Sequence, residues 1–385
     1  MIPIIIRPIT PPDAAQHNMV ASQSFICRIK PEELNQFPTT PVIGAFADDN
    51  STLIAQLEIN AMQSRFCGNS LKCVGVGGVA TKPEFRRTGA VRKLFDHLFE
   101  QDWDISALYP FSSSYYRKFG YETSGLGLRA STDFTELSHI ERSSSVELFD
   151  GSQLDTLLEL YNKTFKNYNL SFIRADSKHF ADKPYETTNY TYMWKNTEGE
   201  YKSFATYHVD REKSCVTVNE IGFTDRESML GILGFLRCYD GNQRTISFTN
   251  LPIDSPLINV FGNLNRVTMG CYNVGAIRVI NVENVLKAKL WPEEHGSFIL
   301  RCNDTVSRNN KTFEVEYQNG KCSVTITDKL PDVVLEPYAA SKILLTGFDG
   351  REDNLSFVEG AEFKSNCNDF IKAFKPLGAF FTGGF

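Results

Sequence analysis

Near residue 80 the spacing of apolar residues changes from that of a strand to that of a helix. Val74, Val76 and Val79 are β-branched residues that favour extended structure. Pro83 lacks the N–H that sheet pairing needs, so it marks the end of this strand. This pattern predicts a strand, a tight loop at residues 86–90 and then an amphipathic helix, whose spacing begins at Gly89. The apolar face of that helix consists of Val91, Leu94, Phe95, Leu98 and Phe99.

Similar patterns divide the rest of the N-terminal third into short elements. Serines suit the start of the last of these, a short helix, and Gly120 suits the left-handed position after its end. The predicted order is strand, helix, hairpin, strand, loop, helix, strand, helix. The elements outside the stretch around residue 80 fall at residues 2–7, 13–25, 42–48, 52–59, 105–109 and 112–120.

Two further patterns follow a polar stretch at residues 130–146, whose Ser and Thr content is typical of a linker. The first repeats the earlier order of elements, which indicates a duplicated fold. Its elements are predicted at residues 153–165, 190–194, 202–209, 214–223, 226–239 and 245–248. The second has an Asn-Gly hairpin turn and trailing helices. Its elements are predicted at residues 276–282, 298–302, 313–317, 322–326, 337–346 and 364–374.

The composition is that of a globular protein and excludes several classes of partner. The chain has 385 residues and a net charge of -6, so it lacks the basic surface typical of nucleic-acid binding. Its nine cysteines are scattered without a Cys-x-x-Cys pair, so we expect reduced thiols in the cytoplasm and no metal site. The apolar run at residues 4–6 is too short for a signal sequence, and no run is long enough to span a membrane.

The loop before the helix combines features that favour an anion. The first N–H groups of a helix have no intrahelical partner, and the helix dipole is positive there. Gly89 has no Cβ, and Arg86 and Arg87 add positive charge. An ordinary basic helix start on a solvated surface is the alternative. The loop lacks Gly-Lys-Ser/Thr, so nucleotide hydrolysis is not indicated.

A strand, loop and helix with the sequence Arg-x-x-Gly-x-small resembles the pyrophosphate loop of the GNAT acyltransferase superfamily. The segment Tyr-Arg-Lys-Phe-Gly-Tyr at residues 116–121 is similar to the short helix that carries a catalytic tyrosine in that superfamily. The order of elements is also that of GNAT proteins. The resemblance implies an α/β fold in which the first pattern is an active GNAT domain.

In the second pattern, the corresponding strand–helix junction at residues 221–228 has no Arg-Arg-x-Gly sequence. Asp225 and Glu227 stand where phosphates would lie, and like charges repel a diphosphate. We therefore interpret this region as a degenerate GNAT-like domain that does not hold coenzyme A.

The whole arrangement resembles the Eis (enhanced intracellular survival) group of N-acetyltransferases. The third pattern resembles the sterol-carrier-protein-like domain that closes some bacterial acetyltransferases. The resemblance implies tandem GNAT folds over residues 1–140 and 141–275, and a sterol-carrier-like domain over residues 276–385 whose tail enters the active site. It also implies a homo-oligomer, a hexamer in relatives.

The resemblance implies which residues bind the co-substrate acetyl-CoA. Val79 and Thr81 pair with the pantetheine arm as an added strand does, and the backbone from Arg86 to Val91 holds the pyrophosphate. The predicted set is Val79, Ala80, Thr81, Arg86, Arg87, Thr88, Gly89, Ala90 and Val91.

Tyr116 matches the tyrosine that protonates the leaving thiolate. A phenol with a pKa of ~10 is protonated at neutral pH and can donate to a thiolate whose thiol has a pKa of ~8.5. The alternative is that Tyr116 only packs. Tyr115 and Tyr121 are its neighbours and compete for the role.

In the Eis group the C-terminal carboxylate reaches the active site as the base, and here that group belongs to Phe385. Gly383 and Gly384 would let the last residues pass through a narrow channel. Phe380 and Phe381 would anchor them by burial. The alternative is a frayed terminus.

The predicted reaction is direct transfer of acetyl to a primary amine of a small molecule, aminoglycoside-like or polyamine-like. The alternatives are acetylation of protein lysines, and binding of a lipid or other apolar ligand by the third domain. Residues 13–25 contain only Asp13 as an acid, and the last twenty residues contain only Asp369. This scarcity of acids argues against polycationic antibiotics.

Overall fold

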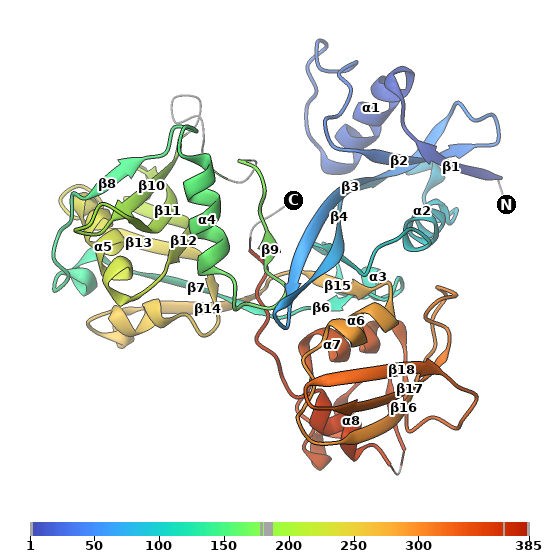
Figure 1. Ribbon diagram of the computed structural model, residues 1–385. Helices are drawn as coiled ribbons and strands as arrows, with labels where there is room; N and C mark the ends of the chain where they lie inside the picture. The colour runs from blue at the N-terminus through green and yellow to red at the C-terminus, as the bar shows by residue number, and fades with distance from the viewer. Residues whose placement is uncertain (1–2, 178–179, 181–187, 365, 383–385) are drawn as a thin grey trace. The chain divides into compact units, whose positions relative to one another are not determined.

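The computed structural model describes residues 3–177, 180, 188–364 and 366–382. The chain forms two compact units, and each is a mixed α/β structure, as predicted (Figure 1). Among the described residues, one unit combines residues 3–124 with Gly275–Leu377, and the other combines Gly125–Val274 with residues 378–382. Within the described ranges, no helix has the length together with the apolar character that crossing a bilayer requires.

The first unit is built on a sheet in which the strands follow the order β1-β2-β3-β4-β5-β15-β6. Most neighbours are antiparallel, but β4 and β5 are parallel. Four of the predicted strands are confirmed with small shifts of their ends, and β3 is longer than predicted. The bounds are β1 Ile4–Pro8, β2 Val42–Ala47, β3 Leu53–Phe66, β4 Asn69–Thr81, β5 Ile105–Leu108, β6 Glu122–Thr123 and β15 Ala276–Val279.

Two helices cover opposite faces of this sheet (Figure 1). Helix α1, Ala14–Phe25, buries Val20 against Val42 and Leu53. Helix α2, Ala90–Phe99, buries its predicted apolar face against the neighbouring, alternate positions of the same strands, among them Ile43 and Ile54. The period-2 alternation of strands therefore separates two cores. A short third helix, α3, spans Ser113–Arg117.

Strand β15 lies inside this first sheet, between β5 and β6. It pairs antiparallel with β5 from Ala276↔Leu108 to Val279↔Ile105. The sequence placed residues 276–282 at the start of a third domain, and for β15 this assignment was wrong. An apolar strand pattern predicts burial, but it does not identify the strands beside which it is buried.

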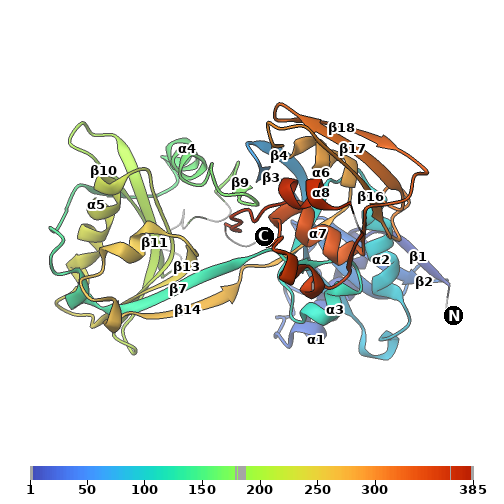
Figure 2. The same ribbon diagram turned by 90° about the horizontal axis from the view of Figure 1, so that it is seen from below.

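The rest of the C-terminal segment forms a five-stranded sheet in the order β18-β17-β16-β19-β20. The turn at Asn319 and Gly320 has two positive φ angles, 52° and 75°, as its Asn-Gly sequence predicts. Helix α8 packs on β16 through Phe370 and Phe298 (Figure 2). The strands β19 and β20 were not predicted, because each has only three residues. The bounds are β16 Gly296–Cys302, β17 Thr312–Gln318, β18 Lys321–Ile326, β19 Val333–Leu335, β20 Ala361–Phe363, α6 Val282–Ala288, α7 Pro337–Thr346 and α8 Asn368–Ala373.

The second unit repeats the plan of the first, so the duplicated fold is confirmed. Its sheet has the order β14-β7-β13-β12-β11-β10-β8, in which β12 and β13 are parallel and α5 follows β12 as α2 follows β4. The bounds are β7 Leu126–Asp133, β8 Val146–Leu148, β9 Phe172–Ile173, β10 Asn189–Lys195, β11 Tyr201–Asp210, β12 Cys215–Phe223, β13 Thr245–Pro252, β14 Thr268–Asn273, α4 Leu154–Thr164 and α5 Arg226–Leu236.

The predicted linker at residues 130–146 was wrong in part. Strand β7 extends to Asp133 and pairs with both β13 and β14, so it belongs to the sheet of the second unit. A 3₁₀ turn at Phe134–Leu137 follows it. Polar residues that alternate with buried ones can form a strand, and Ser/Thr content alone does not exclude one. Other 3₁₀ turns are Pro11–Asp13, Pro83–Phe85, Arg237–Tyr239, Pro256–Val260, Leu264–Arg266 and Glu352–Phe357.

Asp13, just before α1, is expected to stabilise the fold in a pH-dependent way. Its carboxylate accepts two hydrogen bonds from Arg7, at 2.7 and 3.0 Å, and these lower its pKa to about 2. Because the pKa is lower in the folded chain, this stabilisation exists above the ordinary value of ~3.9 and is lost as the pH falls through about 2. Asp13→Asn should lower the free energy of unfolding at pH 7 by about 2 kcal/mol. Urea unfolding should show a much smaller difference near pH 2, and an equal difference at both pH values would contradict this account.

Candidate active site

The parallel strands β4 and β5 separate early. Their pairing covers only Cys73↔Ile105, Val74↔Ser106 and Gly75↔Ala107. Beyond Gly75, β4 continues to Thr81 beside β3 and has no other strand partner in the described part of the chain. The backbone of residues 76–81 therefore offers an open sheet edge, to which an extended ligand with amide groups can hydrogen-bond.

The loop after β4 is shaped to receive an anion. Arg87 has φ 65° and Gly89 has φ 87°, and alternating left-handed residues turn successive N–H groups toward one side. Thr88 Oγ1 donates to the Phe85 carbonyl at 2.8 Å, which closes the loop. Gly89 is the N-cap of α2, and a Cβ built on it would meet no atom within 4 Å. The space in front of the first amides of α2 is therefore open.

One cavity of about 800 Å³ connects this loop with the open edge. Arg86, Arg87 and Arg92 all line it, and no acidic residue is among its described lining residues. The cavity is therefore positive as well as rich in exposed amides, which suits a diphosphate. Eight of the nine predicted co-substrate residues line it: Val79, Thr81, Arg86, Arg87, Thr88, Gly89, Ala90 and Val91.

Ala80 is the ninth predicted residue, and its side chain does not line the cavity. It is buried on the opposite face of β4, in the core that α1 covers. Six further lining residues were not predicted from the sequence. Arg92 was predictable because it lies in the first turn of α2, whereas the others come from α1, the turn after β4 and the segment around α3, and carry no local signal. These six are Ser24, Phe25, Phe85, Arg92, Phe111 and Phe119.

The two adjacent tyrosines of the short helix α3 differ in their exposure to the cavity. Tyr115 lines the cavity, whereas Tyr116 is 4% exposed and has Phe95, Phe111 and Tyr121 around it. Burial raises the pKa of both phenols. Each hydroxyl therefore stays protonated at neutral pH and is able to donate a proton.

Tyr121 is less suited to proton donation. Its hydroxyl lies 2.7 Å from Ser106 Oγ, and Ser106 Oγ donates to the Val74 carbonyl at 2.9 Å. Both side chains are fully buried. The Tyr121 hydroxyl is therefore engaged in the core between β4 and β5.

The end of α3 is held by residues from the C-terminal segment. Gly120 adopts φ 84°, the left-handed conformation predicted for it. Its carbonyl oxygen lies 2.9 Å from Ser341 Oγ on α7, and Ser341 Oγ accepts a hydrogen bond from the N–H of Val279 at 3.0 Å. Lys342 Nζ donates to the Thr123 carbonyl at 3.1 Å. Helices α3 and α7 and strand β15 are thus joined by buried hydrogen bonds.

A buried ion pair supports the same junction. Arg278 Nη2 lies 2.5 Å from Asp304 Oδ1, and their side chains are 1% and 3% exposed. Asn309 Nδ2 donates to the other carboxylate oxygen of Asp304 at 3.0 Å. A Cβ on Gly120 would lie 2.5 Å from Arg278 Nε, so Arg278 packs directly against the turn after α3. Breaking such a buried pair leaves an uncompensated charge, so the pair fixes the local arrangement.

The tail of the chain is anchored within the second unit. Phe380 packs beside Phe165 and Tyr168, and Phe381 packs beside Phe172. Both tail rings are 2% exposed, so their predicted burial is confirmed. Gly383, Gly384 and Phe385 lie outside the described residues. The position of the predicted C-terminal carboxylate therefore stays a prediction.

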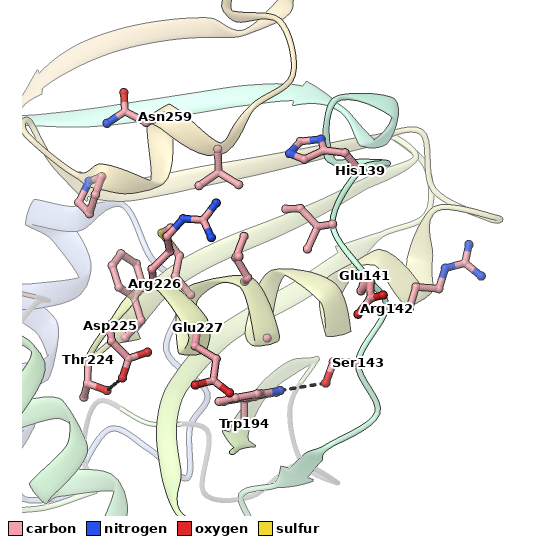
Figure 3. Close-up of a pocket in the computed structure, with 17 residues that line it drawn as sticks. His139, Glu141, Arg142, Ser143, Trp194, Thr224, Asp225, Arg226, Glu227 and Asn259 are labelled. Atoms are coloured by element: carbon pink, nitrogen blue, oxygen red, sulfur yellow. Dashed lines mark hydrogen bonds between the residues drawn. The ribbon is translucent and has the colours of Figure 1, made fainter. Parts of the chain in front are cut away.

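The second unit has a cavity of about 900 Å³ at the start of α5 (Figure 3). Asp225 occupies the N-cap position that Gly89 has in the first unit. Its Oδ1 accepts the N–H of Ser228 at 2.8 Å, and Thr224 Oγ1 donates to Oδ2 at 3.0 Å. The amide end of α5 is thus already occupied by a carboxylate, which supports the interpretation of a degenerate domain. Across the described residues, no three His, Cys, Asp or Glu side chains gather in a way that would hold a metal.

A family model for the acetyltransferase (GNAT) domain matches residues 6–124. This part of the chain is a GNAT acetyltransferase domain. The protein is thus an N-acetyltransferase by enzyme class, and enzymes with this domain use acetyl-CoA. No curated protein sequence matches the chain significantly.

Solved structures resemble the whole chain. A probable N-acyltransferase from Enterococcus faecalis V583 superposes with a TM-score of 0.86 at 15% identity, with 100% of both chains covered. A GCN5-related N-acetyltransferase from Anabaena variabilis gives 0.81 at 17%, again over 100% of both chains. Eis1 from Mycobacterium abscessus gives 0.79 at 16%, over 99% of this chain and 100% of that one. At these identities the likeness establishes a shared fold.

Proposed function

We propose that this enzyme transfers the acetyl group of acetyl-CoA to a primary amine of a small molecule. One observation carries the proposal: the open edge of β4 leads directly into the positive, amide-rich loop before α2, and both line one cavity. An extended amide-containing arm that ends in a diphosphate is the ligand that matches both parts.

The roles of the cavity residues follow from its chemistry. The amides around Val79 and Thr81 pair with the pantetheine arm, and the amides from Arg87 to Val91 bind the diphosphate. The charges of Arg86 and Arg87 strengthen that binding. Holding both ends of the arm fixes the thioester near the point where β4 and β5 separate, which removes much of the entropic cost of the encounter with an amine.

The transfer itself needs one new bond, one broken bond and three proton movements. The amine nitrogen attacks the thioester carbon, so a C–N bond forms as the C–S bond breaks. An ammonium acceptor loses one proton to solvent or a base before attack and a second one after it, while the leaving thiolate takes one up. We assign the donor to the Tyr116 hydroxyl, with Tyr115 as the competing donor that lines the cavity. We assign the base to the carboxylate of Phe385.

Three finer features belong to the same proposal. The acceptor is an aminoglycoside-like or polyamine-like amine, with lysine side chains of proteins as the alternative substrate. Residues 280–377 form a sterol-carrier-like module, for which binding of an apolar ligand is the alternative function. The protein acts in the cytoplasm as a homo-oligomer, a hexamer by resemblance. A screen of thiol release from acetyl-CoA with amines, polyamines, aminoglycosides and lysine peptides, beside a lipid-extraction assay, separates these alternatives.

Gly89→Asp should weaken acetyl-CoA binding about 100-fold, because a carboxylate would stand among the amides that bind the diphosphate. Titration calorimetry measures the change. Gly68→Asp is a matched control, since Gly68 also has a left-handed φ of 80° and open space around its Cβ position, but lies in the turn between β3 and β4. Equal acetyl-CoA affinities of the two variants would show that the loop before α2 is not part of the binding site.

Replacing the tyrosine that protonates the leaving thiolate by phenylalanine should lower kcat about 100-fold and leave the affinity for acetyl-CoA unchanged, because only the proton donor is lost. We expect this result for Tyr116→Phe and a change of less than about threefold for Tyr115→Phe. Steady-state kinetics of thiol release measures both. The reverse result would assign proton donation to Tyr115.

Deletion of Phe385 should lower turnover at least tenfold with little effect on acetyl-CoA affinity, since the base would be displaced or lost. A C-terminal extension of a few residues should act in the same way, because it moves the carboxylate. Stopped-assay product quantification and calorimetry measure the two quantities. Full turnover in either variant would exclude the terminal carboxylate from the mechanism.

A further inference from the structure

Glu58 on β3 carries a carboxylate at the place where β4 leaves β5. It pairs in register with Gly77, two residues beyond Gly75, the last residue of β4 that pairs with β5. The β3–β4 register shifts between Gln56 and Glu58, so this point is an irregularity of the ladder. Such irregularities redirect a side chain at the rim of a sheet.

The side chain of Glu58 lies directly against the backbone of β4. A Cβ built on Gly78 would lie 2.5 Å from Glu58 Oε1, and one on Gly77 would lie 3.0 Å from Oε2. Gly78 also has φ 55°. Two consecutive glycines, one of them left-handed, thus leave the space that this carboxylate occupies beside the open edge.

Glu58 lies on the face of the sheet that α1 covers. Its neighbours Leu57 and Ile59 pack in the α2 core, and the next residue on its own face, Gln56, hydrogen-bonds His17 of α1 at 3.0 Å. The carboxylate is half-buried and makes no hydrogen bond or ion pair with any other side chain or backbone group that the structure describes. A partly desolvated carboxylate gains most from a cationic partner.

We infer that Glu58 binds the ammonium group of the acceptor amine. This inference rests on the proposed function, because that function puts the thioester at the point where β4 and β5 separate. Glu58 supplies an acidic group for the acceptor, which the helix at residues 13–25, with Asp13 as its one acid, does not otherwise provide. The acceptor that fits this carboxylate is a primary alkylammonium ion, which approaches from the face of the sheet that α1 covers. A single carboxylate beside an edge whose own residues, 76–81, are uncharged favours one amine rather than a dense array of charges.

The test compares a charged and an uncharged acceptor on the full chain. Butylamine is an ammonium ion at pH 7, whereas methoxyamine is largely uncharged. Glu58→Gln should raise the KM for butylamine about tenfold or more, because it converts a charge-assisted bond into a neutral one. The KM for methoxyamine and the calorimetric Kd for acetyl-CoA should stay within about twofold, since neither depends on the negative charge. Glu58→Asp, which keeps the charge, should retain most of the preference for butylamine.

Glu100→Gln is the matched control, because it removes an exposed carboxylate of the same unit at the end of α2. A selective loss of butylamine in Glu58→Gln but not in Glu100→Gln supports the inference. Equal losses for both acceptors, or a loss of acetyl-CoA affinity, would show that Glu58 only supports the strand and would overturn it. Absence of transfer to every amine by the wild-type enzyme would refute the proposed function, and this inference with it. Normal transfer together with an unchanged Glu58→Gln variant would refute this inference alone.

Discussion

The short pairing between β4 and β5 is the constraint on which the candidate site depends. Three residues of each strand pair, and the last six residues of β4 have only β3 as a strand neighbour among the described residues. If the two strands stayed together, the edge amides of β4 would be satisfied within the sheet and no ligand arm could pair there. Because they part, these amides stay open to a ligand, and the cavity extends from that edge to the amide end of α2.

Residues far along the chain pack around the place where β4 and β5 separate. Strand β15 pairs with the far side of β5, and Ser341 joins it to the turn after α3. The ion pair between Arg278 and Asp304 is buried behind that turn. Residues 6–124 thus carry the GNAT domain signature, but the sheet of this domain is completed by residues that follow the second unit in sequence. The position of α3, the helix that carries Tyr115 and Tyr116, is therefore set both by residues 1–124 and by residues that follow Gly275.

The two units differ at the start of the corresponding helix, α2 in the first and α5 in the second. In each unit the helix follows a strand that pairs in parallel with the next strand of the sheet, β4 with β5 in the first unit and β12 with β13 in the second. In the first unit the helix begins at Gly89, whose missing side chain leaves the amides open. In the second it begins at Asp225, whose carboxylate already accepts an amide of that helix. The N-cap residue thus decides whether the first amides of the helix are open or already hold an oxygen of the chain.

The sequence by itself determined the local elements and the chemistry of the loop. Periodicity placed α1, α2 and the hairpin strands, and Gly89, Gly120 and the Asn319–Gly320 turn were predictable because their backbone angles favour these residue types. Only the tertiary structure decided which strands lie together. It put β15 in the first sheet and β7 in the second, and it brought Phe25, Phe111 and Tyr115 to one cavity. It also put Glu58 beside the glycines of β4. These contacts join residues far apart in the chain, and pairing across a sheet leaves no periodic trace in either partner's own sequence.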